Sequence, residues 1–217
     1  MKGLFVTFEG PEGVGKSTQA ERLAQRLEEQ GREVVRTREP GGTATGELIR
    51  EVLQHNRTGE AIFPATEALL FAASRAQLVR AVIAPALARG ACVVCDRFAD
   101  STTVYQGYGR GFDVERMIGI NAFAIGDTIP DVTFLLDMDV AVGFDRLHRR
   151  NRERAASRDR FEREDMAFHE RVRAGYLDLA RRWPDRFVVI DASADEDAVA
   201  AGIWDVVRQR APDGGAA

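Results

Sequence analysis

Basic charge in this 217-residue chain is carried almost without lysine, since only Lys2 and Lys16 occur among its 30 lysine and arginine residues. A lysine inside a glycine-rich loop therefore indicates a chemical requirement rather than a general need for charge. Cysteine is equally scarce, and Cys92 and Cys95 have the C-x-x-C spacing also found in redox pairs and metal sites. They lie in an apolar run typical of a buried strand, where residues three apart point to opposite faces, so we favour a structural role.

Long apolar runs are missing as well, and none approaches the roughly 20 residues that a membrane helix needs. The sequence passes from Met1-Lys2 almost directly into a strand-like run, which leaves no room for a signal peptide. The net charge of −4 does not indicate a nucleic-acid-binding protein. We therefore expect a cytoplasmic protein that binds neither membranes nor nucleic acid. We expect one domain over residues 1–210 and a disordered tail over 211–217.

Five short apolar runs alternate with amphipathic segments of helical spacing. Several of the runs are apolar at consecutive positions, which is typical of strands covered on both faces. The alternation predicts an α/β fold with a parallel sheet. The runs are Leu4–Phe8, Glu33–Arg36, Ala91–Cys95, Val132–Leu136 and Phe187–Ile190.

The helical segments differ in how clearly they are marked. Residues 16–30 carry an apolar stripe, and Gly31 is a plausible end point. Residues 64–89 carry a stripe at Leu69, Ala72, Ala76, Val79 and Ile83, and Pro85 should kink the helix near its end. Further stripes occur at Val114, Ile118, Ala122 and Ile125, at 168–183 and at 199–206. Residues 146–163 are rich in arginine without an apolar period, which predicts a mobile insertion between two helices.

Residues 10–17, with the sequence GPEGVGKS, match the phosphate-binding pattern G-x-x-x-x-G-K-[ST] completely. An apolar run precedes the loop and an amphipathic helix follows it, which is the context that the pattern requires. Lys16 should bridge the β- and γ-phosphates of ATP, and Ser17 should bind Mg²⁺. The candidate ATP-binding residues are Gly10, Pro11, Glu12, Gly13, Val14, Gly15, Lys16, Ser17 and Thr18.

Asp96 and Arg97 follow the third apolar run. A carboxylate at the end of a buried strand beside a phosphate loop can hold Mg²⁺ through water. The adjacent guanidinium can bond two phosphate oxygens. The alternative is that Asp96 forms an ordinary surface ion pair.

A phosphate loop alone does not separate a kinase from a GTPase or a motor ATPase, but three features favour a small-molecule kinase. The arginines of 146–163 can neutralise a transferring phosphoryl group, although a solvated face or an RNA-binding patch would have the same composition. Phe71 and Arg75 lie four residues apart on one helix face and suit a base that is stacked and read at its edge. Phe71 could equally pack with Leu78 and Val82. The loop at 37–43 offers Arg38 to an anion.

Six segments together resemble the thymidylate kinase (dTMP kinase) family, which belongs to the nucleoside monophosphate kinases. The resemblance runs from about Lys2 to Arg208, and TREPGGT and YQG are its most specific parts. The segments are 8–18 (FEGPEGVGKST), 37–43 (TREPGGT), 71–75 (FAASR), 96–98 (DRF), 101–107 (STTVYQG) and 159–162 (DRFE).

The resemblance implies a three-layer P-loop NTPase fold, in which helices flank a five-stranded parallel sheet and an arginine-rich lid covers about 146–163. It implies a homodimer and the reaction ATP + dTMP → ADP + dTDP with Mg²⁺, in dTTP biosynthesis. It places Ser17 and Asp96 at the metal.

Carried over by position, the resemblance also assigns the acceptor site. Phe71 would stack on thymine, Arg75 would bond its edge, and Thr102 would lie near the base. Glu12 would hold the sugar 3′-hydroxyl. The remaining roles fall to Tyr105 near the 2′ position, Gln106 in the pocket wall, and Arg97 on the acceptor phosphate with Arg38 and Arg50 as helpers.

No basic residue occupies the variable positions 11–14 of the loop. The transition-state arginine should therefore come from the lid, as in bacterial members. Arg154 and Arg158 are the candidates, with Arg150 and Arg152 as substitutes. Together with Lys16 and Arg97 they form the predicted catalytic set.

Other readings stay open at this point. A kinase for another nucleotide or nucleoside would share the loop, the lid and the sheet. A regulatory GTPase would need a guanine-reading motif such as N-K-x-D, which the chain lacks. A nucleic-acid-binding ATPase would use the arginine-rich segment as its RNA contact.

Overall fold

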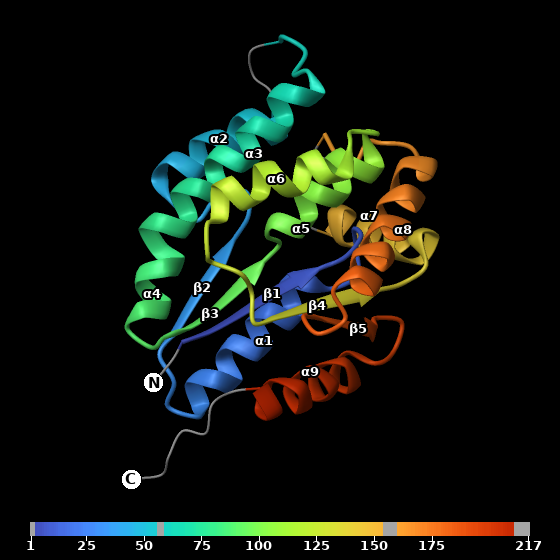
Figure 1. Ribbon diagram of the computed structural model, residues 1–217. Helices are drawn as coiled ribbons and strands as arrows, with labels where there is room; N and C mark the ends of the chain where they lie inside the picture. Colours follow the sequence, from blue (N-terminus) through green and yellow to red (C-terminus); the bar gives the residue numbers. More distant parts are fainter. Residues whose placement is uncertain (1–2, 56–58, 154–159, 211–217) are drawn as a thin grey trace.

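The computed structural model describes residues 3–55, 59–153 and 160–210 and has a five-stranded parallel sheet at its centre (Figure 1). The order β2-β3-β1-β4-β5 confirms the predicted α/β fold. Each strand was predicted within two residues at either end. The strands are β1 (Leu4–Glu9), β2 (Val34–Arg38), β3 (Cys92–Asp96), β4 (Val132–Asp137) and β5 (Phe187–Asp191).

Helices cover both faces of the sheet and form the two outer layers. On one face, α1 (Lys16–Glu29) and α9 (Glu196–Arg210) pack against β1 and β4. The other face is covered by α3 (Pro64–Leu78), η1 (Val79–Ile83), α4 (Ala84–Ala88), α5 (Ala99–Thr102), η2 (Thr103–Gly109), α6 (Val114–Ile125) and α8 (Met166–Arg182). The remaining helices are α2 (Ala44–His55), beside α3, and α7 (Val140–Glu153).

The two cysteines confirm the strand reading of their segment. Both are free, Cys92 packs in the core cluster under α1, and Cys95 packs on the opposite face with Phe5 and Leu78. The C-x-x-C spacing thus brings no pair of thiols together.

The predicted stripe of the 64–89 helix was partly wrong. Leu69 is 60% exposed, whereas Arg75, which was placed outside the stripe, is 1% exposed. The helix turns a polar face inward because Arg75 finds buried partners on other elements. Near Pro85 the helix passes through the π-helical turn η1, in keeping with the expected irregularity.

Two further expectations need correction. The stripe predicted for α6 is offset, since Met117, Asn121 and Ala124 are buried while Ala122 is exposed. Residues 146–153 belong to α7 rather than to an insertion. The buried side chains that anchor this helix, Val140, Phe144 and Leu147, begin before the arginine-rich segment, so the segment continues a helix that starts upstream. The expectations for 154–159 and for the tail at 211–217 lie outside the described residues.

The continuous helical stretch Pro64–Ala88 is long and apolar enough, by length and composition alone, to cross a membrane. The sequence analysis had not predicted such a stretch, because it found no apolar run of about the length that a membrane helix needs. Leu78, Val79 and Ile83 in this stretch are buried against the central sheet. Since the core helix of a globular domain passes the same test, the observation is weak support for a membrane span.

Candidate active site

A cavity of about 390 Å³ opens where the carboxyl ends of β1, β2 and β3 meet. Ligands of open parallel sheets bind at this edge. The cavity brings together all nine residues predicted for the acceptor, and six of the nine loop residues, with Glu12 counted in both sets. Its lining includes Glu12, Arg38, Arg50, Phe71, Arg75, Arg97, Thr102, Tyr105 and Gln106, with Gly13, Gly15, Lys16, Ser17 and Thr18. Gly10, Pro11 and Val14 do not line it, and the Val14 side chain is in the core.

The phosphate loop leaves β1 and leads directly into α1. Gly15 precedes the helix at φ 90°, a conformation that glycine adopts without strain. Lys16 Nζ donates to the carbonyl oxygens of Gly10 and Pro11, at 3.0 and 2.5 Å. Burial, followed by the nearby Arg97 charge, lowers the pKa of Lys16 to about 8. The Lys16 ammonium is therefore held inside the loop, and a phosphate bound there would neutralise its positive charge.

The loop also lies against α7 with no room for a side chain at Gly13. A Cβ there would collide with the Gly143 carbonyl oxygen. The close backbone approach fixes the loop to the helix that carries Arg146, Arg149 and Arg150.

Ser17 and Asp96 face each other across the cavity floor, with the Ser17 hydroxyl donating to Asp96 Oδ2. Asp96 Oδ1 is a buried oxygen without a hydrogen-bond partner among the described residues. One hydroxyl and one carboxylate are hard oxygen donors of the kind that Mg²⁺ prefers beside phosphates. The pair therefore fits the predicted metal position.

Glu12 lies between Arg97 and Tyr105. Its Oε1 accepts from Arg97 Nη2 at 2.7 Å and from the Tyr105 hydroxyl at 2.8 Å. Burial favours the neutral carboxyl, but the charges of Arg97 and Lys16 lower the pKa of Glu12 to about 2. Glu12 is therefore ionised at neutral pH.

Arg97 has an unusual backbone, with φ 67° in the left-handed region. Glu9, at the end of β1, holds the turn that follows, because its carboxyl group accepts from the backbone of Phe98 at 2.7 Å and from the Ser101 hydroxyl at 2.6 Å. Burial, with the neighbouring Asp100 charge, raises the pKa of Glu9 to about 7. Glu9 lies within the matching segment 8–18, but its role in supporting Arg97 had no sequence signal of its own.

Arg75 is held on three sides. Its Nη1 donates to Asn121 Oδ1 and its Nη2 to Thr102 Oγ1, both at 2.6 Å, and its Nε lies 2.7 Å from Glu39 Oε2. Burial raises the pKa of Glu39 to about 7, against the attraction of Arg75. Sequence reasoning missed Asn121 and Glu39 as orienting partners, although Glu39 lies within the TREPGGT segment.

Phe71 packs beside Tyr105 and Phe161 rather than with Leu78 and Val82.

The outer arginines of the cavity are engaged with other groups. Arg38 Nη2 lies 3.1 Å from Glu47 Oε2, and Arg50 Nη1 donates to the Pro40 carbonyl at 2.9 Å. Arg150, one of the substitutes named for catalysis, lines the cavity. The first candidates, Arg154 and Arg158, lie outside the described residues.

A second cavity of about 510 Å³ adjoins the phosphate loop on the side of α7. Its walls include residues of the phosphate loop, the arginines of α7 and the loop 192–196 after β5. Arg146 Nη1 donates to the Ala192 carbonyl at 3.0 Å and so closes one end. The loop 192–196 was missed because it carries no motif.

A parallel sheet of this strand order, with a phosphate-binding loop leaving β1 and a lysine buried in that loop, is the architecture of a P-loop NTPase. Comparison with known proteins narrows the class. The sequence model of the thymidylate kinase family matches residues 8–203, so the chain belongs to this family and is a kinase.

Individual relatives agree over nearly the whole chain. A thymidylate kinase from Geobacter sulfurreducens is 52% identical over 211 residues, covering 97% of this chain and 99% of the relative. One from Caulobacter vibrioides is 50% identical, covering 96% and 98%. The crystal structure of thymidylate kinase from Ehrlichia chaffeensis matches with a TM-score of 0.76 at 35% identity, covering 95% of this chain and 99% of that one.

Proposed function

We propose that the protein phosphorylates dTMP to dTDP with ATP and Mg²⁺, as a step of dTTP biosynthesis in the cytoplasm. The observation that carries the proposal is the cavity in which the P-loop and the Phe71–Arg75 face of α3 both take part. A phosphate donor and a base-bearing acceptor can therefore meet within one site.

On the donor side, the backbone N–H groups of residues 13–18 and the Lys16 ammonium would bind the ATP phosphates. The cavity against α7 and residues 192–196 has room for the donor nucleoside. Ser17 and Asp96 would hold Mg²⁺, which supplies positive charge to the phosphate oxygens when bound. On the lid side, Arg154 or Arg158 would stabilise the transition state, with Arg150 and Arg152 as substitutes.

On the acceptor side, Phe71 would stack on thymine and Arg75 would donate to its edge. Arg75 has five N–H donors, and its contacts with Asn121, Thr102 and Glu39 leave capacity for a base oxygen. Glu12 would accept from the 3′-hydroxyl, with Tyr105 beside the 2′ position and Thr102 and Gln106 in the wall. Arg97, helped by Arg38 and Arg50, would bind the acceptor phosphate.

No strong general base is needed for this transfer, because the attacking oxygen already belongs to an anionic phosphate. The protein's task is to align the donor and the acceptor and to neutralise the charge between them. Lys16 and Arg97 would do both, and the contact of each with the Gly10 carbonyl oxygen supports this role.

The acceptor is tested by measuring ADP release with dTMP, dUMP, dCMP, dGMP, AMP and UMP under the same conditions. We expect dTMP to give the highest kcat/KM. Arg75 would donate to an oxygen of the base, and Tyr105 would limit the space near the sugar. A protein that released ADP with AMP or UMP but not with dTMP would contradict the proposal and favour another nucleotide kinase.

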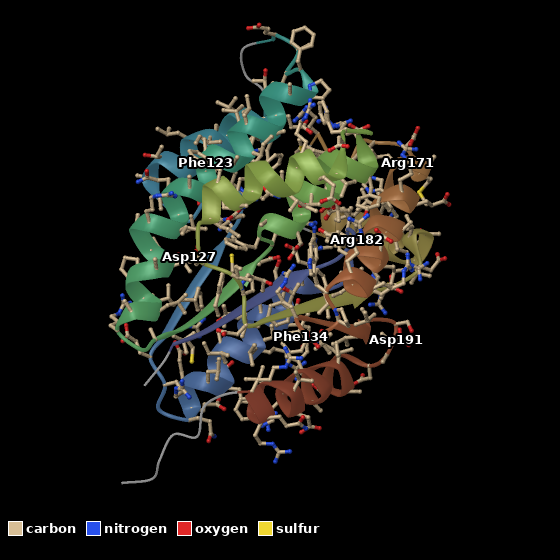
Figure 2. All side chains as sticks on the ribbon, in the orientation of Figure 1. Phe123, Asp127, Phe134, Arg171, Arg182 and Asp191 are labelled. Carbon is tan, nitrogen blue, oxygen red and sulfur yellow. The ribbon has the colours of Figure 1, made fainter. Side chains whose placement is uncertain are left out.

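We further propose a homodimer that forms through the outer surface of α2, α3 and α6. Large apolar side chains gather on these neighbouring helices, and Phe123 on α6, labelled in Figure 2, is 85% exposed. Leu48 on α2 and Leu69 on α3 are 72% and 60% exposed. Exposed apolar side chains grouped in this way are typical of protein interfaces.

Phe123→Glu should convert the dimer to a monomer, because a charge at the centre of an apolar interface costs several kcal/mol to bury. Light scattering coupled to gel filtration measures the mass. Val189→Glu on the edge strand β5 is the control, since Val189 is 49% exposed and away from these helices. A wild-type protein that is monomeric at micromolar concentration, or a Phe123→Glu protein that stays dimeric, would refute this interface.

A further inference from the structure

Glu67 is a buried carboxylate on the same face of α3 as the proposed base-binding residues. It precedes Phe71 by four residues and Arg75 by eight, which places the three side chains along one helix face. Its side chain is 1% exposed. A carboxylate this deeply buried needs specific partners, and it has three.

The three partners come from two other parts of the fold. Glu67 Oε1 accepts from Gln106 Nε2 at 2.8 Å and from Arg110 Nε at 3.3 Å. Glu67 Oε2 accepts from Arg160 Nη2. One carboxylate thus ties α3 to η2 and to the segment that begins at Arg160.

Arg160 in turn fixes the position of Phe161. Its Nε donates to the Leu53 carbonyl at 3.1 Å, and its guanidinium lies 4.8 Å from the centre of the Phe161 ring. The Phe161 ring lies 5.7 Å from that of Phe71 and 6.0 Å from that of Tyr105. Phe161 therefore joins the two aromatic walls of the cavity, and Arg160 holds it there.

Gln106 is oriented by the same carboxylate. The Gln106 amide nitrogen faces Glu67, because it donates to the carboxylate oxygen Oε1. The other amide atom, Gln106 Oε1, is buried without a hydrogen-bond partner among the described residues, and Gln106 lines the cavity. The wall therefore offers an acceptor. This suits a base that carries a ring N–H, such as thymine, and disfavours cytosine, whose N3 is itself an acceptor.

We infer that Glu67 is a positioning residue of the acceptor site, which holds Phe161 through Arg160 and sets the amide of Gln106 to accept from the base. This inference rests on the proposed function. The inference goes beyond the proposed function, because Glu67 does not line the cavity and yet would control both how the base fits and which base is chosen.

Glu67→Gln tests the inference with almost no change of shape. The introduced amide can donate to Gln106 Oε1, and the Gln106 amide nitrogen, a donor, then turns toward the base. Arg160 also loses its anionic partner. We expect KM for dTMP to rise about 10- to 100-fold, the loss typical of one charged hydrogen bond. KM for ATP should stay within about twofold, and the preference for dTMP over dCMP should fall about tenfold, as for one mispaired polar contact.

Glu164→Gln is the matched control. Glu164 Oε1 lies 2.6 Å from Arg110 Nη1, so this variant removes one negative charge from the same arginine as Glu67→Gln does. Its KM and base preference should stay close to wild type. Equal losses in both variants would show that only the charge around Arg110 matters, and would overturn the inference.

Arg160→Gln keeps the test decisive if Glu67→Gln does not fold. Its side chain is 24% exposed, so the substitution is milder. It should raise KM for dTMP by loosening Phe161 and leave the preference over dCMP unchanged, because Gln106 keeps its bond to Glu67. Wild-type KM in a folded Glu67→Gln or Arg160→Gln protein would refute the role of Glu67. Wild-type enzyme that does not use dTMP would instead refute the proposed function.

Discussion

Arg97→Ala is expected to lower kcat by about 10³-fold, because it removes a guanidinium from the point where the phosphate loop meets the acceptor pocket. Arg97 Nη2 contacts Glu12 at 2.7 Å, and Nη1 lies 3.3 Å from the Gly10 carbonyl oxygen. A substrate phosphate at this place would be neutralised by a planar group that can bond two of its oxygens. Steady-state kinetics with dTMP varied at saturating ATP measures kcat and KM separately.

The fold should survive this substitution. Glu12 keeps the Lys16 charge and the Tyr105 hydroxyl as partners, so its carboxylate is not left alone. Arg97→Gly serves as a matched variant. Both lack the guanidinium, but glycine adopts φ 67° freely, whereas alanine is strained by about 1 kcal/mol there.

Arg97→Gly should therefore unfold at a higher temperature than Arg97→Ala and be equally inactive. Arg38→Ala should lower kcat far less, since Arg38 is half-exposed and paired with Glu47. A folded Arg97→Ala protein with near-normal kcat would show that Arg97 serves structure alone. An equal loss in Arg38→Ala would show that no single arginine dominates.

The parts of the site that the sequence predicted are those encoded by local spacing. The loop at 10–17 and the pair Asp96-Arg97 each occupy one short segment, and neighbouring strands of a parallel sheet bring such segments together. The three central strands β1, β3 and β4 were found for the same reason, because burial on both faces leaves an apolar run that can be seen without the rest of the chain. The edge strands β2 and β5 are only partly buried, and their short runs of Val and Ile marked them.

The residues that were missed are acidic and amide groups whose partners are distant in sequence. Glu39 pairs with Arg75, Glu67 with Gln106 and Arg160, and Asn121 with Arg75. Each reads as an ordinary surface residue until the fold brings its partner close. The same polar contacts explain the wrong stripe on α3, since a helix face that buries Arg75 carries no apolar period.

The loop at 10–17 contacts both sides of the reaction that we propose. Lys16 would face the donor phosphates, while Glu12, four residues earlier, contacts Arg97 and Tyr105 in the proposed acceptor pocket. Each of the two charges affects the pKa of the other group. The Glu12 carboxylate raises the pKa of Lys16, and the Lys16 ammonium lowers the pKa of Glu12. A change in the occupancy of one substrate site should thus be felt electrostatically in the other.

Lys16→Met should reduce kcat/KM for ATP by about 10³-fold or more, because methionine keeps most of the side-chain volume and removes the charge that phosphate transfer requires. The pH profile gives an independent test in the wild-type enzyme. Burial lowers the pKa of Lys16 to about 8, so the cation is present below this pH and is lost as the pH rises through it. We expect kcat/KM for ATP to fall above pH 8, since that ratio reports the free enzyme.

The near absence of lysine allows the same group to be tested chemically. In a Lys2→Arg protein, Lys16 is the one lysine side chain, and an amine-directed reagent followed by peptide mass analysis reports on it alone. Because only the neutral amine reacts, modification should increase as the pH rises through about 8, well below the ordinary lysine range. ATP should block it by occupying the loop and restoring the positive charge. Modification that ATP does not slow, or Lys16→Met activity that still falls above pH 8 as in wild type, would show that another group carries the donor phosphates.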